Sequence, residues 1–170
     1  QRTRLVTKFY RPQRWSAEQI LEEHAFLAEL AAEEVPVVAA LPFPDGGTLR
    51  RLAVPGGADA IDFCLFPRFG GRAPEEVSDV LAGRLGALCG RIHVVGARGA
   101  FAARATLSGV SYAGFALAQL LASDRIPTAQ RRRFEVAAES LIELVDDWLG
   151  GVAMHRIHGD FHLGNLIERD

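Results

Sequence analysis

Near its end the chain carries the stretch HGDFHLGN, which begins at His158 and gathers two histidines, an aspartate and an asparagine. A carboxylate can accept the proton of an attacking hydroxyl, and an amide oxygen can bind a hard cation. In a strand, His158, Asp160 and His162 would instead alternate onto one face as a metal site for hydrolysis, although Gly159 and Gly164 disfavour a regular strand. A polar turn is the third interpretation, and the stretch alone leaves all three open.

The spacing of this stretch resembles the H-G-D-x-H-x-x-N loop of the aminoglycoside phosphotransferase-like kinases, a branch of the protein-kinase fold. In that family the aspartate orients or accepts the proton of the attacking hydroxyl, and the asparagine binds magnesium. The resemblance therefore implies Asp160 as the catalytic residue, Asn165 as the metal ligand, and ATP with Mg²⁺ as the cofactors. We expect His158 and His162 to brace the loop. A tight glycine-containing loop suits this chemistry, because both side chains must converge on one phosphate.

The start of the chain alternates apolar and polar residues over Thr3–Tyr10, which predicts a strand with Lys8 on one face. Ser16 and Gln19 then form a capping box. The box predicts a helix over 17–33, with an apolar stripe made of Ile20, Phe26, Leu27, Leu30 and Ala31.

By resemblance, this first strand and helix hold the ion pair of a kinase nucleotide site. Lys8 corresponds to the phosphate-binding lysine of the family, and Glu23 on the helix corresponds to its acidic partner. Glu22 stays an alternative partner, because both glutamates fall beside the apolar stripe.

Apolar runs bounded by proline or glycine predict strands over 37–41, 48–54 and 60–66. The last strand leads into FCLFPRFGG, which resembles the kinase hinge. There the backbone from Leu65 to Arg68 is expected to hydrogen-bond adenine, and Phe66 or Leu65 is expected to line the pocket. Phe66 and Arg68 are thus the predicted nucleotide-binding residues of this segment.

The segment PRFGGRAP predicts a boundary between two lobes. Residues 1–67 would form a partial N-terminal lobe, and residues 68–170 a partial helical C-terminal lobe. Helical spacing of apolar residues predicts helices over 75–95, 112–122 and 128–149, followed by a strand-like return over 155–167. The expected fold class is α+β, a two-lobed protein-kinase-like fold.

The composition of the chain narrows the classes of partner. The 170 residues carry a net charge of −2 and a pI near 6.2, so nucleic acid and anionic membrane surfaces are not expected partners. No apolar run reaches the ~18 residues of a membrane span. Cys64 and Cys89 lie in apolar runs without metal-ligand spacing, which predicts buried free thiols and favours a cytoplasmic location.

Several further stretches, among them TKFYRPQRWSAEQILEEHAF, EEVPVVAAL and LGALCGRIHVVGA, resemble the bacterial stress response kinase A group. The resemblance implies a Ser/Thr protein kinase. The alternatives are a small-molecule kinase acting on an aminoglycoside, choline, homoserine or methylthioribose, and a non-catalytic kinase-like binding module. A complete member has a glycine-containing loop before the lysine strand and a second magnesium-binding aspartate after the catalytic loop. We therefore expect a piece truncated at both ends, which by itself would be nearly inactive.

Overall fold

The computed structural model describes residues 4–53, 56 and 60–169. The chain forms two compact units, Gln1–Arg104 together with His155–Asp170, and Ala105–Met154. Every residue predicted to take part in the site belongs to the first unit. The lobe boundary predicted between residues 67 and 68 stays a prediction.

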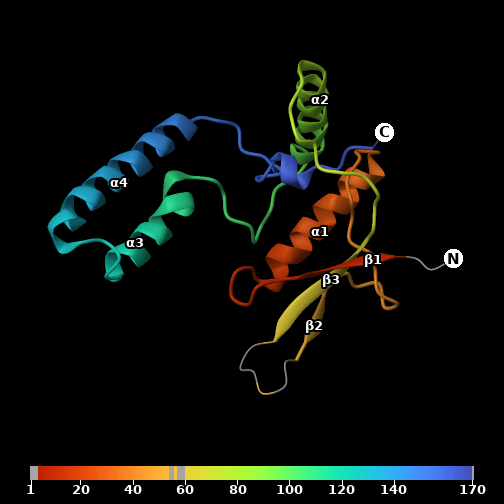
Figure 1. Cartoon of the computed structure of the whole chain (residues 1–170), viewed down its shortest axis with the longest axis horizontal. Coiled ribbons are helices and arrows are strands. Elements are labelled where there is room, and N and C mark those ends of the chain that lie inside the picture. Colours follow the sequence, from red (N-terminus) through yellow and green to blue (C-terminus); the bar gives the residue numbers. More distant parts are fainter. Residues whose placement is uncertain (1–3, 54–55, 57–59, 170) are drawn as a thin grey trace. The chain divides into compact units, whose positions relative to one another are not determined.

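The first unit contains a three-stranded antiparallel sheet of β1 (Leu5–Phe9), β2 (Arg50–Leu52) and β3 (Ile61–Pro67). β3 lies in the centre, between β1 and β2 (Figure 1). The register places Lys8 opposite Cys64. Side chains of directly opposed residues share a face of the sheet, so Lys8 lies on the same face as a fully buried thiol.

Two of the predicted strands differ from the structure. The strand predicted over 37–41 is wrong, because this described segment has no strand geometry and is joined to β3 by a hydrogen bond from the Leu41 amide to the Leu65 carbonyl, 2.8 Å long. Pro36 and Pro42 bracket it and have no N–H group for a sheet ladder. The strand predicted over 48–54 is confirmed only in the shorter β2, and residue 54 lies outside the described residues.

Helix α1 (Ala17–Ala32) begins as predicted at the capping box. The Gln19 amide donates to Ser16 Oγ over 3.2 Å, and the Ser16 amide donates to the Gln19 side chain over 3.0 Å. The predicted stripe is confirmed at Ile20, Phe26 and Leu30, which are buried. It is wrong at Ala31, which is exposed, and the buried face includes His24, which was not predicted.

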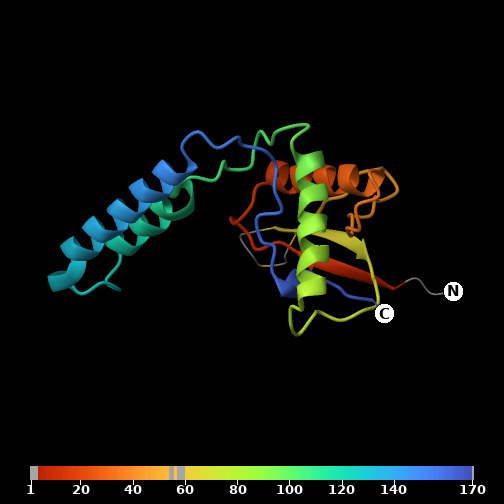
Figure 2. The same cartoon turned by 90° about the horizontal axis from the view of Figure 1, so that it is seen from above.

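Two apolar clusters fix α1 in the first unit. Ile20 packs with Tyr10 and Cys64 against the sheet. Further along the helix, Phe26 and Leu30 pack with residues of the second helix of this unit, and Phe101 and Phe161 close the same cluster. Figure 2 shows α1 beside the sheet and next to that second helix. Since Phe161 follows Asp160 directly, packing of its partly buried ring ties the predicted catalytic loop to the core.

The second helix, α2 (Asp79–Gly96), starts later than the predicted residue 75. Ser78 is its N-cap and accepts a hydrogen bond from the Leu81 amide over 3.2 Å. A serine cap satisfies a free N–H group of the first turn, which explains the later start. Only the end of α2 is deeply buried, at Ile92, Val95 and Gly96.

Gly96 is expected to resist substitution, because a Cβ atom there would lie 2.1 Å from the Arg156 carbonyl oxygen. We expect Gly96→Ala to lower the free energy of unfolding by about 1 to 2 kcal/mol, despite the helix propensity of alanine. Gly86→Ala on the same helix is the matched control, since a Cβ atom there meets nothing within 4 Å. Urea unfolding should show the control as neutral or stabilised, and equal stability of both variants would contradict the close contact.

The second unit consists of η1 (Val110–Gly114), α3 (Phe115–Ala122) and α4 (Thr128–Leu149). The two predicted helices are confirmed, with a π-helical first turn replacing the start of the first one. The Gly109 amide donates to Asp146 on α4 over 2.6 Å. Among the helices that the structure describes, none combines the length and the apolar character needed to cross a membrane.

Candidate active site

Lys8 and Glu23 form an ion pair, with Lys8 Nζ 3.0 Å from Glu23 Oε1. β1 supplies the lysine and α1 the glutamate, and both side chains are partly exposed, at 44% and 28%. The ammonium group also lies 4.7 Å from the centre of the Tyr10 ring. The structure therefore brings together the two residues that the resemblance pairs, and Lys8 keeps a solvent-accessible side. Their role toward a nucleotide stays a prediction.

Glu22 has a different set of partners. Its carboxylate accepts hydrogen bonds from the backbone amides of Ala102, Ala103 and Arg104, at 2.5, 3.0 and 2.9 Å. Desolvation raises the pKa of Glu22, but these amides and the nearby Arg104 guanidinium outweigh it and hold the pKa below its usual value. Glu22 thus anchors the segment after α2 to α1, whereas Glu23 faces Lys8.

The predicted catalytic loop is irregular, so the strand-like return predicted over 155–167 is wrong. Gly159 has φ +76°, a left-handed conformation that L side chains rarely adopt and that turns the chain just before Asp160. A short 3₁₀ turn, η2 (Leu163–Asn165), follows, and His162 caps it by accepting from the Gly164 amide at 3.1 Å.

This loop geometry does not support the metal-hydrolysis interpretation. Within the described ranges, no three His, Cys, Asp or Glu side chains gather in a metal-binding group. His162 Nε2 lies 3.6 Å from Asp160 Oδ2. The His158 ring nitrogen instead accepts from the Asp160 amide at 3.2 Å. Both histidines brace the loop, which is the role expected for them.

Asp160 and Asn165 are linked directly. The amide nitrogen of Asn165 donates to the backbone carbonyl of Asp160 at 2.8 Å and to its carboxylate Oδ2 at 3.0 Å. Because these two bonds use both hydrogens of the amide nitrogen, the amide oxygen is the atom of Asn165 left to bind a cation. Both residues are exposed. This oxygen fits Mg²⁺, which typically takes few protein ligands and completes its shell with phosphate oxygens and water.

The ion pair and the loop both depend on α1, because Glu23 lies on this helix and Phe161 of the loop packs against the cluster that includes Phe26. Desolvation by surrounding protein atoms lowers the pKa of His158, although much of the residue is exposed, and the carboxylates of Asp160 and Glu23 oppose this effect. The His158 ring also packs edge-on against Phe161, with ring centroids 5.3 Å apart.

The predicted hinge residues lie at the end of β3. The half-buried Phe66 ring packs against the cluster of Tyr10, Ile20 and Cys64, so this side chain is part of the packing between the sheet and α1. Arg68 is exposed, and its backbone amide donates to the Arg4 carbonyl over 3.2 Å. Contact of either residue with a nucleotide stays a prediction.

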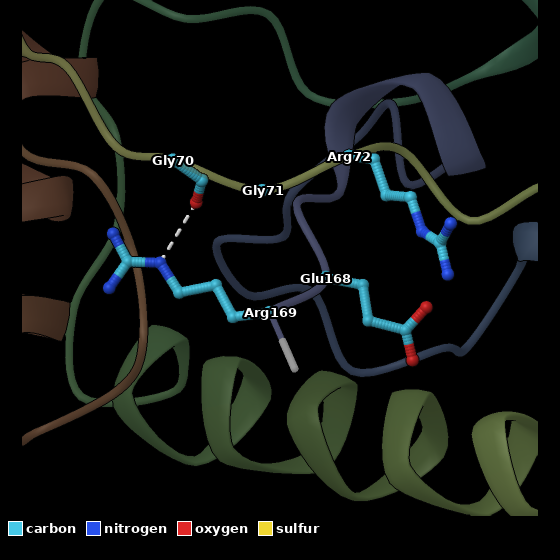
Figure 3. Close-up of a pocket in the computed structure, with 5 residues that line it drawn as sticks. All are labelled: Gly70, Gly71, Arg72, Glu168 and Arg169. Atoms are coloured by element: carbon cyan, nitrogen blue, oxygen red, sulfur yellow. Dashed lines mark hydrogen bonds between the residues drawn. The ribbon is translucent and has the colours of Figure 1, made fainter.

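The segment after the predicted hinge is tied to the end of the predicted catalytic loop. Arg72 and Glu168 exchange two backbone hydrogen bonds, of 3.2 and 2.8 Å, and Arg169 Nε donates to the Gly70 carbonyl over 2.9 Å. Figure 3 shows these residues, which line an open pocket. Gly71, at φ +136°, permits the approach, since a Cβ atom would lie 2.4 Å from the Ile167 side chain.

A second tie runs from α1 to the residues before the loop. Arg156 is 8% exposed, and its guanidinium donates to both carboxylate oxygens of Glu29, at 2.9 and 2.7 Å. It also lies 4.6 Å from the Phe26 ring centre. Arg104, Glu29 and Arg156 were not predicted from the sequence as functional or structural residues. Only Glu29 offered a sequence signal, because it is a charged residue beside the apolar stripe of α1, as Glu22 is.

Folding stability is expected to depend on pH through His24, which is hydrogen-bonded to Tyr10 and Thr48 at 3.1 and 2.8 Å. Desolvation lowers its pKa from 6.5, helped by Lys8 and Arg104 and opposed by Glu23. Below pH 6.5 the unfolded chain therefore binds more protons than the folded one. We expect the melting temperature to fall as the pH is lowered from 7.5 to 5.5.

The variant His24→Gln should weaken this dependence, because glutamine does not titrate. Melting curves of both proteins across that pH range test the expectation. His158, whose pKa is also lowered, would leave a residual slope in the variant. An unchanged slope would show that His24 is not the responsible group.

Comparisons with known proteins show which family the chain is similar to. Two proteins named Stress response kinase A, from Salmonella typhi and Escherichia coli (strain K12), are 38% and 36% identical to the chain over 170 residues. Each alignment covers 99% of this chain and 50% of the relative, so the chain spans about half the length of the curated relatives it matches.

Two solved structures share the fold. An amicoumacin kinase in complex with AMP-PNP, Ca²⁺ and Ami superposes on 98% of this chain and 49% of its own, with a TM-score of 0.72 and 17% identity. A microcompartment-associated aminopropanol kinase covers 66% of this chain and 36% of its own, with a TM-score of 0.55 and 19% identity. The expected α+β, protein-kinase-like fold class is confirmed. Residues 1–169 match the Phosphotransferase enzyme family, and the chain belongs to that family.

Proposed function

We propose that this protein is a kinase that transfers the γ-phosphate of ATP to a hydroxyl group. Within that class we propose a cytoplasmic Ser/Thr protein kinase of the stress response kinase A type, on the strength of the similarity to relatives of that name. The observation that carries the kinase proposal is the Lys8–Glu23 ion pair on β1 and α1, together with the Asp160–Asn165 hydrogen bond in a loop whose Phe161 packs against the cluster that includes Phe26 of α1. The free thiols of Cys64 and Cys89 support a reducing compartment.

In this proposal Lys8 binds phosphate oxygens of the nucleotide, and Glu23 holds the lysine in place. Phosphoryl transfer depends mostly on positioning and on neutralising charge, so a fixed cation on a rigid strand is effective. Phe66 and Arg68 would lie at the adenine end of the nucleotide site. The Lys8 side chain is 44% exposed, which leaves it accessible to a ligand.

Asp160 has the chemistry of a residue that orients the acceptor hydroxyl. Its carboxylate uses Oδ2 for Asn165, and the second oxygen can accept the hydroxyl proton. Asn165 would hold Mg²⁺ through its amide oxygen, and the bound cation would neutralise charge on the phosphates. Phe161 is partly buried and packs against the core cluster, and this packing would hold the backbone of Asp160 in place.

A small hydroxyl compound is the second candidate acceptor. It is favoured by the structural similarity to kinases named for an antibiotic and for aminopropanol, although that similarity concerns the fold. The catalytic loop itself does not distinguish the two acceptors, because the same carboxylate could orient either hydroxyl.

The test is phosphate transfer by the complete gene product from radiolabelled ATP with Mg²⁺. One set of reactions contains protein acceptors, and a second contains choline, homoserine, methylthioribose or an aminoglycoside. We expect labelled serine or threonine in protein. Label only in a small molecule would favour the second candidate, and ATP binding without transfer would support a non-catalytic binding module.

A further inference from the structure

We propose that Arg104 is a positioning residue that holds Glu23 in the orientation that pairs with Lys8. This inference rests on the proposed function and extends it to a residue outside the strand, helix and loop described above. Arg104 lies after α2, at the end of the first unit.

The two oxygens of Glu23 have different cationic partners. Oε1 lies 3.0 Å from Lys8 Nζ, and Oε2 lies 2.5 Å from Arg104 Nη2. A carboxylate held at one oxygen can rotate about its last torsion angle, which is broad and weakly restrained for glutamate. Contact at both oxygens fixes this angle. The guanidinium therefore holds the carboxylate plane so that one oxygen faces Lys8 Nζ.

Arg104 can do this because it is itself held on several sides. Its Nε donates to the Gln19 carbonyl over 2.9 Å, and its guanidinium lies 4.7 Å from the centre of the Trp15 ring. Its backbone amide donates to Glu22 over 2.9 Å. The Arg104 side chain is 22% exposed, so solvent screens the pair with Glu23 only in part. A planar guanidinium suits this role, since its donors point in fixed directions.

These contacts also explain why two adjacent glutamates differ in role. Glu22 binds the backbone of residues 102–104, and this brings the Arg104 side chain to Glu23. Gln19 adds a bond from its side-chain nitrogen to the Ala103 carbonyl, 3.0 Å long. About one turn of α1 is thereby joined to the segment that carries the guanidinium.

Arg98 provides a matched control. Arg98 also follows α2, and its guanidinium lies 2.6 Å from the carboxylate of Glu33, the C-cap residue of α1. Both partners of that pair are about half exposed, and neither contacts Lys8. If these arginines only hold α1 against the segment after α2, both arginine variants should lose activity. If Arg104 positions Glu23, only the Arg104 variant should lose activity.

The experiment is a double-mutant cycle on phosphate transfer by the complete gene product. The variants are Arg104→Gln, Glu23→Gln, the double variant, and Arg98→Gln, each first shown to be folded by its melting curve. We expect Arg104→Gln to lower kcat/KM for ATP about tenfold and Glu23→Gln about a hundredfold. If Arg104 acts through Glu23, the double variant should match Glu23→Gln within about threefold, because the two effects are not independent.

Other outcomes overturn the inference. If the loss of kcat/KM in the double variant equals the product of the losses in the two single variants, Arg104 acts independently of Glu23. Equal losses in Arg104→Gln and Arg98→Gln would show a general structural effect. If Arg104→Gln does not fold, Arg104→Lys takes its place in the same cycle, with the same criteria. Inactive wild-type protein would refute the proposed function itself, whereas active wild type with an unchanged Arg104 variant would refute only this inference.

Discussion

Replacing Asp160 by asparagine is expected to lower kcat for phosphate transfer by about a thousandfold, within the range of losses seen when a positioned acid or base is removed. The asparagine side chain is nearly the same size, so the loop fold should survive. Its amide no longer accepts a proton and lacks the negative charge near the acceptor. ATP binding should stay within about threefold of wild type, since Lys8 and Glu23 do not contact Asp160 directly.

The measurement is kcat from initial rates together with the dissociation constant for an ATP analogue, both with the complete gene product. Glu168→Gln is the matched control, because it also removes an exposed carboxylate of the terminal segment. A kcat for Asp160→Asn within about threefold of wild type would remove Asp160 from the chemistry and leave the kinase proposal to stand on other residues.

Replacing Glu29 by glutamine is expected to give the largest loss of stability, about 2 to 3 kcal/mol in the free energy of unfolding. The change leaves the Arg156 guanidinium, only 8% exposed, without its anionic partner. Two backbone carbonyls at the end of α2, of Val95 and Gly96, still accept from it at 3.3 Å. The expected loss is smaller than for a fully buried pair, because the Glu29 side chain is 48% exposed and solvent screens it.

Glu33→Gln is the matched control for this prediction. It breaks the exposed pair with Arg98 on the same side of the molecule, where both side chains are about half exposed. Such an exposed pair contributes little to stability, because solvent and salt screen it. Urea unfolding of both variants at pH 7 gives the comparison, and similar losses would show that burial of Arg156 does not govern the stability of this contact.

The local elements of the first unit were largely predictable from the sequence. The capping box at Ser16 and Gln19 begins α1, and alternation over the first residues gives β1, because both patterns act over a few residues. The conformation of residues 155–167 could not be predicted from local patterns. Gly159 adopts a left-handed turn, and the rest of the loop is held by side-chain bonds that no periodicity reveals.

The amino-acid sequence by itself was enough to recognise the motif HGDFHLGN and the order of Lys8, Glu23 and the predicted catalytic loop. It also predicted most of the helices and strands. Only the tertiary structure decided between Glu22 and Glu23, which are neighbours on one helix and differ only in what packs against them. It also brought Arg104 to Glu23, across a separation that sequence spacing does not constrain. The physical reason is that propensity and periodicity act within an element, whereas partners of charged side chains depend on how separate elements pack together.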